Sequence, residues 1–470
     1  MMLFAQYRNF EEKILQNVKQ NGIQHRSNAS SGLWLGTLVG LSAAVTILRE
    51  QNSYSEICLL VGTTGFGLVL CSLCLYVRLS MQEVTAKDFH AIYFLPAIVT
   101  SMLFLLAANK GLLTSVTWGL TVASLGTWGV LQLMSALPNC FTMGEATAVT
   151  HSFILFLMSA VTNLPLRYHL PPIHVNDIST VFLQVGILYV IWVCVLCRYF
   201  PILRSTRYFY FMTISLLCFI TLPILYVILD QNPIIWMLSF VFNTRKRIVV
   251  VIYWAICLLS SVFILAYQIL ANFQATSSIR KIFHVLATFV YVPGVIYDPS
   301  LLYLASGLIL ALFIAIEILR VLKIPPLGEV LQQGFTVFAD EKDSLLSLTP
   351  LYLMCGLSFP LWMPTSNLPL LVLLSGVLTV GIGDTAASFV GGKWGSHKWH
   401  DTEKTVEGTV ACILCQICII LGLTFSGFVN DYWSLLRSIL AVVAISVIEG
   451  RTNQVDNLAL PLLMYVCQMI

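Results

Sequence analysis

Long apolar segments alternate with short polar ones from residue 32 to the end of the chain. Most of them are about 20 residues long, enough for an α-helix to cross roughly 30 Å of hydrocarbon. Isolated strands would leave backbone groups unpaired in lipid, and the alternation of a membrane β-barrel is absent from the sequence. The pattern predicts an all-α, polytopic transmembrane helix bundle of roughly 13–15 spans. The candidate spans are residues 32–48, 56–78, 91–109, 112–137, 146–166, 178–198, 209–229, 247–271, 281–297, 299–320, 346–362, 366–390, 406–425, 432–450 and 457–470.

Composition supports a membrane protein and removes several other classes. Hydrophobic residues make up 58% of the chain and charged residues only 10%, whereas a soluble domain carries about 25% charge. A formal net charge of +3, with no basic run longer than residues 245–247, excludes a nucleic-acid partner. Two CxxC pairs lie inside apolar segments without a companion ligand, which is typical of buried helix residues. Residues 1–31 lack the apolar core of a secretory signal, so we expect the first membrane helix to direct targeting.

The positions of Lys and Arg orient the bundle, because short loops rich in these residues stay on the cytosolic side. From residue 272 onward all the basic residues considered fall at one face, which we expect to be cytosolic. Residues 245–247 land opposite, so either 230–246 is re-entrant or this loop breaks the rule. The residues that define the cytosolic face are Arg280, Lys281, Arg320, Lys323, Lys342, Lys393, Lys398, Lys404 and Arg451.

The polar loops divide the chain into three regions. Residues 1–31 are expected to be a cytosolic N-terminal segment, and residues 32–271 an N-terminal transmembrane region with chemically plain loops. Residues 272–470 carry longer loops dense in Gly, Asp, Glu, Lys and Thr. We therefore expect the chemistry to lie in a C-terminal catalytic transmembrane domain, 272–470.

The most informative segment is 381–395, followed by 404–409. Asp384 comes at the end of an apolar helix among small and hydroxyl residues, and small residues let a backbone approach a ligand. A helix beginning near Thr405 would present its positive end to a phosphate, with Lys404 as a point charge beside it. Helix packing by small residues plus a solvated loop is the alternative interpretation. The Walker A pattern is absent, so a different nucleotide site is needed.

Three further polar clusters are predicted to emerge at the same face. Glu449, Asp456 and Asn457 supply the hard oxygen ligands that Mg²⁺ prefers. Arg280, Lys281 and His284 open a helix, and residues 280 and 284 share one of its faces. The third cluster is the charged loop 338–343, for which simple solvation is the alternative. Acids beside bases around a phosphate cradle indicate phosphoryl or nucleotidyl transfer onto a lipid-borne group.

At these residues the sequence resembles the CTP-dependent polyprenol kinase family, and dolichol kinases within it. The resemblance is dense over 280–461 and thin before that, although 141–145 is similar to an element of dolichol kinases in particular. One departure is Arg451, where a less basic residue is expected. The matching motifs are Gly383-Asp384-Thr385-x-Ala387-Ser388-x-x-Gly391-x-x-x-Gly395, Lys404-Thr405-x-Glu407-Gly408-Thr409, Thr452-x-Gln454-x-Asp456-Asn457-x-x-x-Pro461, Arg280-Lys281-x-x-His284, Phe338-x-Asp340-Glu341-x-Asp343 and Phe141-Thr142-x-Gly144-Glu145.

The resemblance implies a magnesium-dependent kinase of the endoplasmic reticulum membrane that phosphorylates dolichol with CTP. Its product, dolichyl phosphate, is the lipid carrier for protein glycosylation. The CTP site is expected at the cytosolic face within Gly383 to about Lys398. The residues expected to bind the nucleotide are Gly383, Asp384, Thr385, Ser388, Gly391, Gly395, Lys398, Lys404, Thr405, Arg280 and Lys281.

Physical chemistry assigns roles within that set. Asp384 and Asp456 are the expected Mg²⁺ ligands, because phosphoryl transfer depends on positioning and charge neutralisation. Lys404, with Arg280 or Lys281, would stabilise charge on the γ-phosphoryl oxygens. Either Glu407 or His284 would accept the proton of the dolichol hydroxyl, and the sequence does not rank the two.

Two other functions remain open at the level of the sequence. A cytidylyltransferase acting on phosphatidate would also use CTP and Mg²⁺ in a polytopic bundle. A transporter would need polar residues near the middle of its spans, whereas these clusters lie at helix ends. Polyprenol chain length, oligomeric state and the role of residues 1–250 are not specified by any motif.

Overall fold

The computed structural model describes residues 2–20, 22–26, 29–47, 56–81, 91–270, 277–338, 343–365, 368–400 and 402–470. All named elements are helical, with short 3₁₀ or π-helical segments marked η. They are α1 (Met2–Gln20), α2 (Leu33–Thr46), α3 (Glu56–Met81), η2 (Ala91–Tyr93), α4 (Phe94–Leu106), α5 (Leu112–Ala136), α6 (Met143–His169), α7 (Val175–Tyr199), η3 (Pro201–Arg204), α8 (Thr206–Leu216), η4 (Leu217–Thr221), α9 (Leu222–Leu229), α10 (Pro233–Phe242), α11 (Arg245–Leu270), α12 (Ser277–Tyr297), α13 (Pro299–Val321), α14 (Leu327–Phe338), α15 (Leu348–Trp362), α16 (Leu370–Leu373), η5 (Val377–Asp384), α17 (Thr385–Trp394), α18 (Val406–Phe425), α19 (Tyr432–Arg451) and α20 (Asp456–Met469).

The all-α, polytopic prediction is confirmed, and each of the apolar segments contains a helix. Among the described residues, eight helices are long and apolar enough to cross a membrane, and four more are apolar but only 10–17 residues long. Apolar composition does not distinguish a lipid-facing helix from one buried in protein. Helix α2, for example, has 14 residues, most of them buried. The sequence pattern did not predict α1, α10 or α14, which lie outside the long apolar segments.

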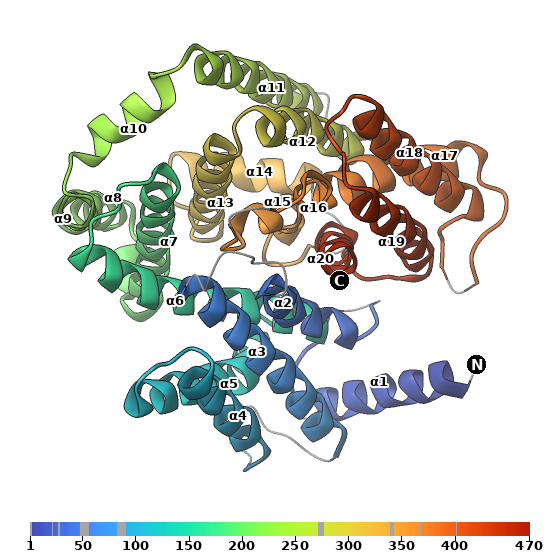
Figure 1. The fold of residues 1–470 in the computed structure, drawn as a ribbon, viewed down its shortest axis with the longest axis horizontal. Helices are drawn as coiled ribbons and strands as arrows, with labels where there is room; N and C mark the ends of the chain where they lie inside the picture. The colour runs from blue at the N-terminus through green and yellow to red at the C-terminus, as the bar shows by residue number, and fades with distance from the viewer. Residues whose placement is uncertain are drawn as a thin grey trace.

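Helix α20 joins the two halves of the chain. It lies near the centre of Figure 1, where it packs against α2 from the N-terminal half and against α15 and α19 from the C-terminal half. The Thr46 hydroxyl of α2 lies 2.8 Å from the Tyr465 hydroxyl of α20, and both side chains are buried. A single apolar core therefore contains residues from both halves, such as Leu35 and Leu462.

The basic run at 245–247, which the charge pattern left unexplained, begins α11, and its Arg247 contacts the turn between α12 and α13. Arg247 Nε is 2.6 Å from Asp298 Oδ2, just before α13, and its guanidinium stacks on Phe240 at 4.0 Å. The preceding helix α10 has only ten residues and is too short to span a bilayer. Asp298 thus partners a cation at the end of the bundle opposite the predicted cytosolic face, where the span count had placed residues 245–247.

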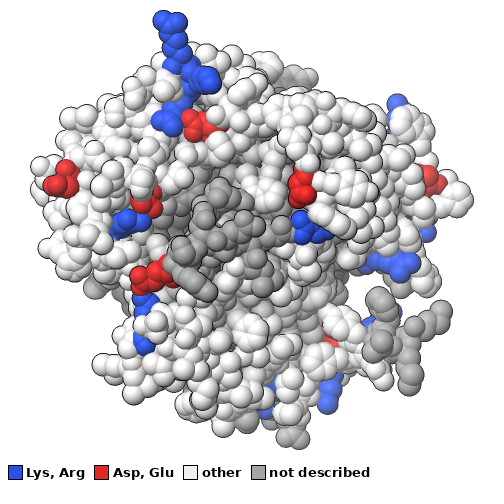
Figure 2. Space-filling view, in the orientation of Figure 1, with Lys and Arg blue, Asp and Glu red and all other residues white. Residues whose placement is uncertain are grey.

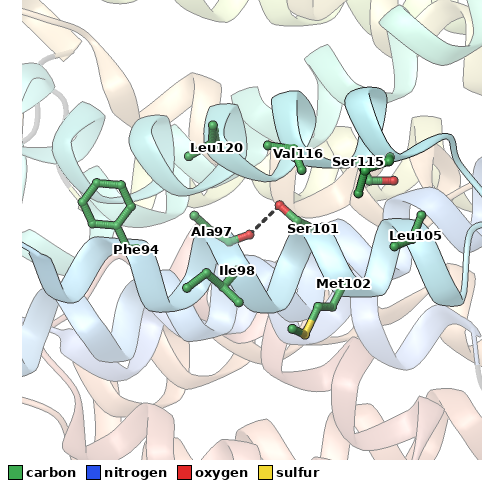
Figure 3. A pocket seen from close by; sticks show the side chains of 10 residues that line it. Phe94, Ala97, Ile98, Ser101, Met102, Leu105, Ser115, Val116 and Leu120 are labelled. Carbon is green, nitrogen blue, oxygen red and sulfur yellow. Dashed lines mark hydrogen bonds between the residues drawn. The ribbon is translucent and has the colours of Figure 1, made fainter.

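The surface suits a lipid environment. On the face shown in Figure 2, uncharged residues predominate and charged side chains form small, separate groups. The spanning part of α11 is only 6% buried. An apolar groove of about 340 Å³ lies between α4 and α5 and is lined by residues such as Phe94, Ile98 and Val116 (Figure 3). Its Ser101 hydroxyl donates to the Ala97 carbonyl of its own helix (2.7 Å), so this groove presents hydrocarbon to its surroundings.

Gly356→Ala is expected to lower the thermal unfolding midpoint of the detergent-purified protein. A Cβ at this position of α15 would overlap the Asn457 carbonyl oxygen of α20, and overpacking costs about 1–3 kcal/mol. Gly422→Ala in α18 is the control, because a Cβ there meets nothing within 4 Å and alanine favours a helix by up to ~1 kcal/mol. Equal midpoints for the two variants would mean that α15 and α20 are not in close contact.

Candidate active site

The segment around Asp384 is shaped by its glycines. Asp384 is the last residue of η5, a π-helical stretch that continues directly into α17, so it lies within a helix and not, as the sequence had predicted, at the end of one. π-Helical turns are common at functional sites. A Cβ at Gly381 would overlap the Thr288 hydroxyl of α12, and one at Gly383 would overlap the Gln416 amide of α18. The glycines therefore let η5 lie tightly between α12 and α18, and Asp384 is buried at its end.

Two side chains of α12, Lys281 and His284, face Asp384. The Lys281 ammonium donates to Asp384 Oδ2, and His284 Nδ1 lies 3.3 Å from the same oxygen. Residues three apart on a helix lie on one face, so Lys281 and His284 reach the acid together. Arg280 precedes them on α12 and is half-buried. The sequence had predicted a face shared by residues 280 and 284, whereas the side chains that reach Asp384 are Lys281 and His284.

Lys404 forms the second part of the site. Its Nζ lies 3.0 Å from Glu449 Oε1 and 3.0 Å from Asp456 Oδ2, and it also donates to the Glu449 carbonyl oxygen at 2.9 Å. Glu449 lies in the last turn of α19, and Asp456 begins α20. Burial lowers the pKa of the Lys404 ammonium, but the carboxylates of Asp456, Glu449 and Asp384 raise it by more, so its pKa lies above the ordinary value. Lys404 therefore stays positively charged at neutral pH.

Three carboxylates converge between these cations. Oxygens of Asp384, Glu449 and Asp456 all lie within 4.8 Å of one another. Asp456 Oδ1 is buried and has no hydrogen-bond partner among the described residues. Carboxylate oxygens are the ligands that Mg²⁺ prefers, and an unpaired buried oxygen is costly unless something binds it. The cluster can hold a divalent cation, and in it Glu449, which the sequence had grouped with Asp456, joins the two acids expected as ligands.

The glycine-rich segment after Asp384 packs against the start of α18. Thr405 caps this helix, accepting a hydrogen bond from the Gly408 N–H at 3.2 Å. A Cβ at Gly391 or at Gly395 would crowd the Thr405 side chain. Thr385 and Ser388 lie on α17 beside this contact, and the buried Thr385 hydroxyl has no hydrogen-bond partner in the described structure. The segment therefore brings hydroxyl and backbone groups to the helix terminus where a phosphate was expected.

Two residues expected at the site contact a surface hairpin instead. Backbone pairing joins Lys398 to Thr405, and the Lys398 ammonium pairs with Glu403. The Glu407 carboxylate accepts from the Ser396 hydroxyl at 2.7 Å and from the His397 N–H at 3.1 Å. These contacts organise the hairpin. Spacing along the sequence placed both residues near the helix terminus but did not indicate which way their side chains point.

Asp343 is the last residue of the charged loop 338–343. Residues 339–342 lie outside the described residues. Asp343 Oδ1 accepts from the Leu348 N–H at 2.9 Å and from the Thr349 N–H at 3.1 Å. Asp343 therefore stabilises the start of α15.

The sequence is similar to those of known proteins. A family model described as dolichol kinase matches residues 22–349. The chain belongs to the dolichol kinase family. The match extends through most of the N-terminal region, where the motif resemblance was thin.

The curated relatives carry the same name. The dolichol kinase of Homo sapiens is 33% identical over 364 residues, which cover 72% of this chain and 66% of that protein, just under two thirds of its length. The dolichol kinase of Mus musculus is 31% identical over 477 residues, with 95% and 87% of the two chains covered. Dolichol kinase EVAN of Arabidopsis thaliana is 29% identical over 510 residues, with 94% and 88% covered. No solved structure matches the chain.

We expect the purified protein to bind Mn²⁺, used as a spectroscopic substitute for Mg²⁺, at the carboxylate cluster. Asp384→Asn, Glu449→Gln and Asp456→Asn should each weaken binding at least tenfold in titrations followed by electron paramagnetic resonance, because each removes a charged ligand. Asp431→Asn is the control, since Asp431 caps the opposite end of α19. Wild-type affinity in all three cluster variants would contradict a metal site here.

Proposed function

We propose that this protein is a lipid kinase that transfers the γ-phosphoryl group of CTP to the hydroxyl of dolichol. The product, dolichyl phosphate, would serve protein glycosylation at the endoplasmic reticulum membrane, with the site facing the cytosol. The observation that carries the proposal is the convergence of Asp384, Glu449 and Asp456 with Lys281 and Lys404. The choice of CTP rests on the resemblance of segment 383–398 to polyprenol kinases.

The carboxylate cluster fits a resident Mg²⁺, which when bound would neutralise charge on the nucleotide phosphates. Asp384, Glu449 and Asp456 would hold it, and the unpaired Asp456 Oδ1 is an available ligand atom. Lys281 and Lys404 now neutralise these acids. The three acids would be neutralised by a cation that they hold, in place of the lysines. The two ammonium groups would then be free to contact the γ-phosphoryl oxygens, where negative charge must be stabilised.

The geometry favours His284 over Glu407 as the proton acceptor. His284 Nδ1 faces Asp384 at 3.3 Å. With its Nδ1 proton directed at this carboxylate, the imidazole would keep Nε2 as an acceptor. Transfer forms a bond between the dolichol oxygen and the γ-phosphorus, breaks the bond to the CDP leaving group and passes the hydroxyl proton to His284 Nε2. Glu407 is already engaged by the hairpin.

The apolar exterior of the bundle suits the lipid substrate. An isoprenoid chain is far longer than the bilayer is thick, so most of it must stay among the lipids outside the protein. It would lie along the apolar exterior and reach the polar cluster from the side, between helices. At the cluster the hydroxyl of such a chain would meet a nucleotide that enters from the water phase.

We expect the protein, reconstituted with dolichol, to label the lipid from γ-labelled CTP and not from α-labelled CTP. Asp384→Asn should lower the rate at least a thousandfold, since it removes a charge that positions both Lys281 and the cation. Asp431→Asn should act like the wild type. Labelling from α-labelled CTP, with phosphatidate as acceptor and pyrophosphate release, would instead identify a cytidylyltransferase.

His284→Ala is expected to lower kcat for dolichol phosphorylation by about 10²–10⁴-fold, the usual contribution of a positioned general base. Glu407→Gln should lower it much less, because its carboxylate binds the hairpin. Steady-state rates at saturating CTP and Mg²⁺ separate the two residues. A larger loss in Glu407→Gln than in His284→Ala would reverse the assignment.

A further inference from the structure

The loop that connects Glu449 to Asp456 is tied to the N-terminal half of the chain. Its central side chain, Gln454, is fully buried. The amide nitrogen of Gln454 donates to the Ser30 carbonyl at 3.1 Å and to the Ser30 hydroxyl at 2.8 Å. Its amide oxygen lies 3.3 Å from the Thr142 hydroxyl, which donates to it. A loop that carries two cluster acids at its ends is thus fixed by side chains more than 300 positions away in the sequence.

The backbone around Ser30 is shaped to accept this amide. Gly32 has φ 62°, a left-handed conformation that favours glycine, and a Cβ there would overlap the Gln454 amide. The Gly144 N–H donates to the Ser31 carbonyl at 2.9 Å, and a Cβ at Gly144 would overlap the Gly32 carbonyl. The segment 29–32 is therefore held tightly between the start of α6 and the loop before α20.

A buried ion pair fixes Thr142 from the other side. Arg26 Nη2 donates to Glu145 Oε1 at 2.7 Å, and both side chains are almost wholly buried. Glu145 Oε2 accepts from the Thr142 N–H at 3.1 Å, while the Glu145 N–H donates to the Thr142 hydroxyl oxygen at 3.2 Å. This reciprocal pairing is a capping box. Since the Thr142 oxygen accepts from Glu145, its hydrogen remains available to donate to Gln454.

Buried charges are stable only when they are paired and hydrogen-bonded. The Arg26–Glu145 pair, the capping box and the Gln454 amide form one continuous set of contacts. That set runs from the N-terminal segment to the residue two positions before Asp456. Nothing in the phosphoryl-transfer mechanism uses these residues directly.

We propose that Gln454 is a positioning residue, held by Ser30 and Thr142, that fixes the separation of the Glu449 and Asp456 carboxylates. The N-terminal half thereby completes the cation site of the C-terminal half. This inference rests on the proposed function, in which those two acids bind a divalent cation. It gives residues 26–32 and 141–145 a role that is separate from contact with either substrate.

Gln454→Ala tests the inference against Gln468→Ala. Gln468 is a buried glutamine near the C-terminal end of α20, the end opposite Asp456, and its amide donates to the Ser438 hydroxyl at 3.0 Å. Full-length protein in nanodiscs would be measured for thermal unfolding and, without nucleotide, for Mn²⁺ binding by electron paramagnetic resonance. Both variants should unfold at lower temperature. Only Gln454→Ala should weaken Mn²⁺ binding, by tenfold or more, and raise the Mg²⁺ requirement for transfer by the same factor with KM for dolichol unchanged.

A second pair of variants keeps the test decisive if Gln454→Ala does not fold. Thr142→Val removes the hydroxyl that Gln454 accepts from and should weaken Mn²⁺ binding similarly, whereas Thr142→Ser keeps the hydroxyl and should bind like the wild type. Equal Mn²⁺ affinities in Gln454→Ala and Gln468→Ala, or wild-type affinity in Thr142→Val, would overturn the inference. If the Mn²⁺ pattern holds but the wild type transfers no phosphate from CTP, the inference stands and the proposed function fails.

Discussion

Mutual repulsion among Asp384, Glu449 and Asp456 is the constraint on which this structure depends. Three carboxylates whose oxygens lie within 4.8 Å cannot all remain charged in a partly buried site without nearby cations. Lys281 and Lys404 supply those cations, from α12 and from the residue two positions before α18. Packing of the helices that carry these residues offsets the remaining electrostatic repulsion. A cluster held together in this way is suited to binding a further cation and a phosphate.

The fold meets this constraint by bringing the ends of three helices to a buried turn of a fourth. Glu449 lies in the last turn of α19, Asp456 begins α20 and Lys404 stands just before α18, while Asp384 lies where η5 continues into α17. Helix ends place polar groups near the membrane boundary, where charge is less costly than at mid-span. Helix α20 then links this arrangement to α2 and the N-terminal core. Both halves of the chain therefore contribute to the geometry of one site.

Sequence patterns predicted the helical class and the convergence of Asp384, Lys404 and Asp456. They also grouped Glu449 with Asp456 as a source of oxygen ligands, but did not show that the Glu449 carboxylate lies against Asp384. Glu407 and Lys398 fit the family spacing, yet the hairpin between α17 and α18 directs both side chains to its own partners. Periodicity gives the face of a helix, but the direction of a loop side chain depends on contacts between distant segments. The tie from Gln454 to Thr142 spans 312 positions and has no local signal.

The most direct test of the central claim is a cryo-electron microscopy map of the protein with Mn²⁺ and CTP in nanodiscs. The account predicts density for an ion bonded to carboxylate oxygens of Asp384, Glu449 and Asp456, with the Lys281 and Lys404 ammonium groups moved onto the nucleotide phosphates. An ion bound elsewhere, with both lysines still paired to the acids and the nucleotide away from them, would contradict it.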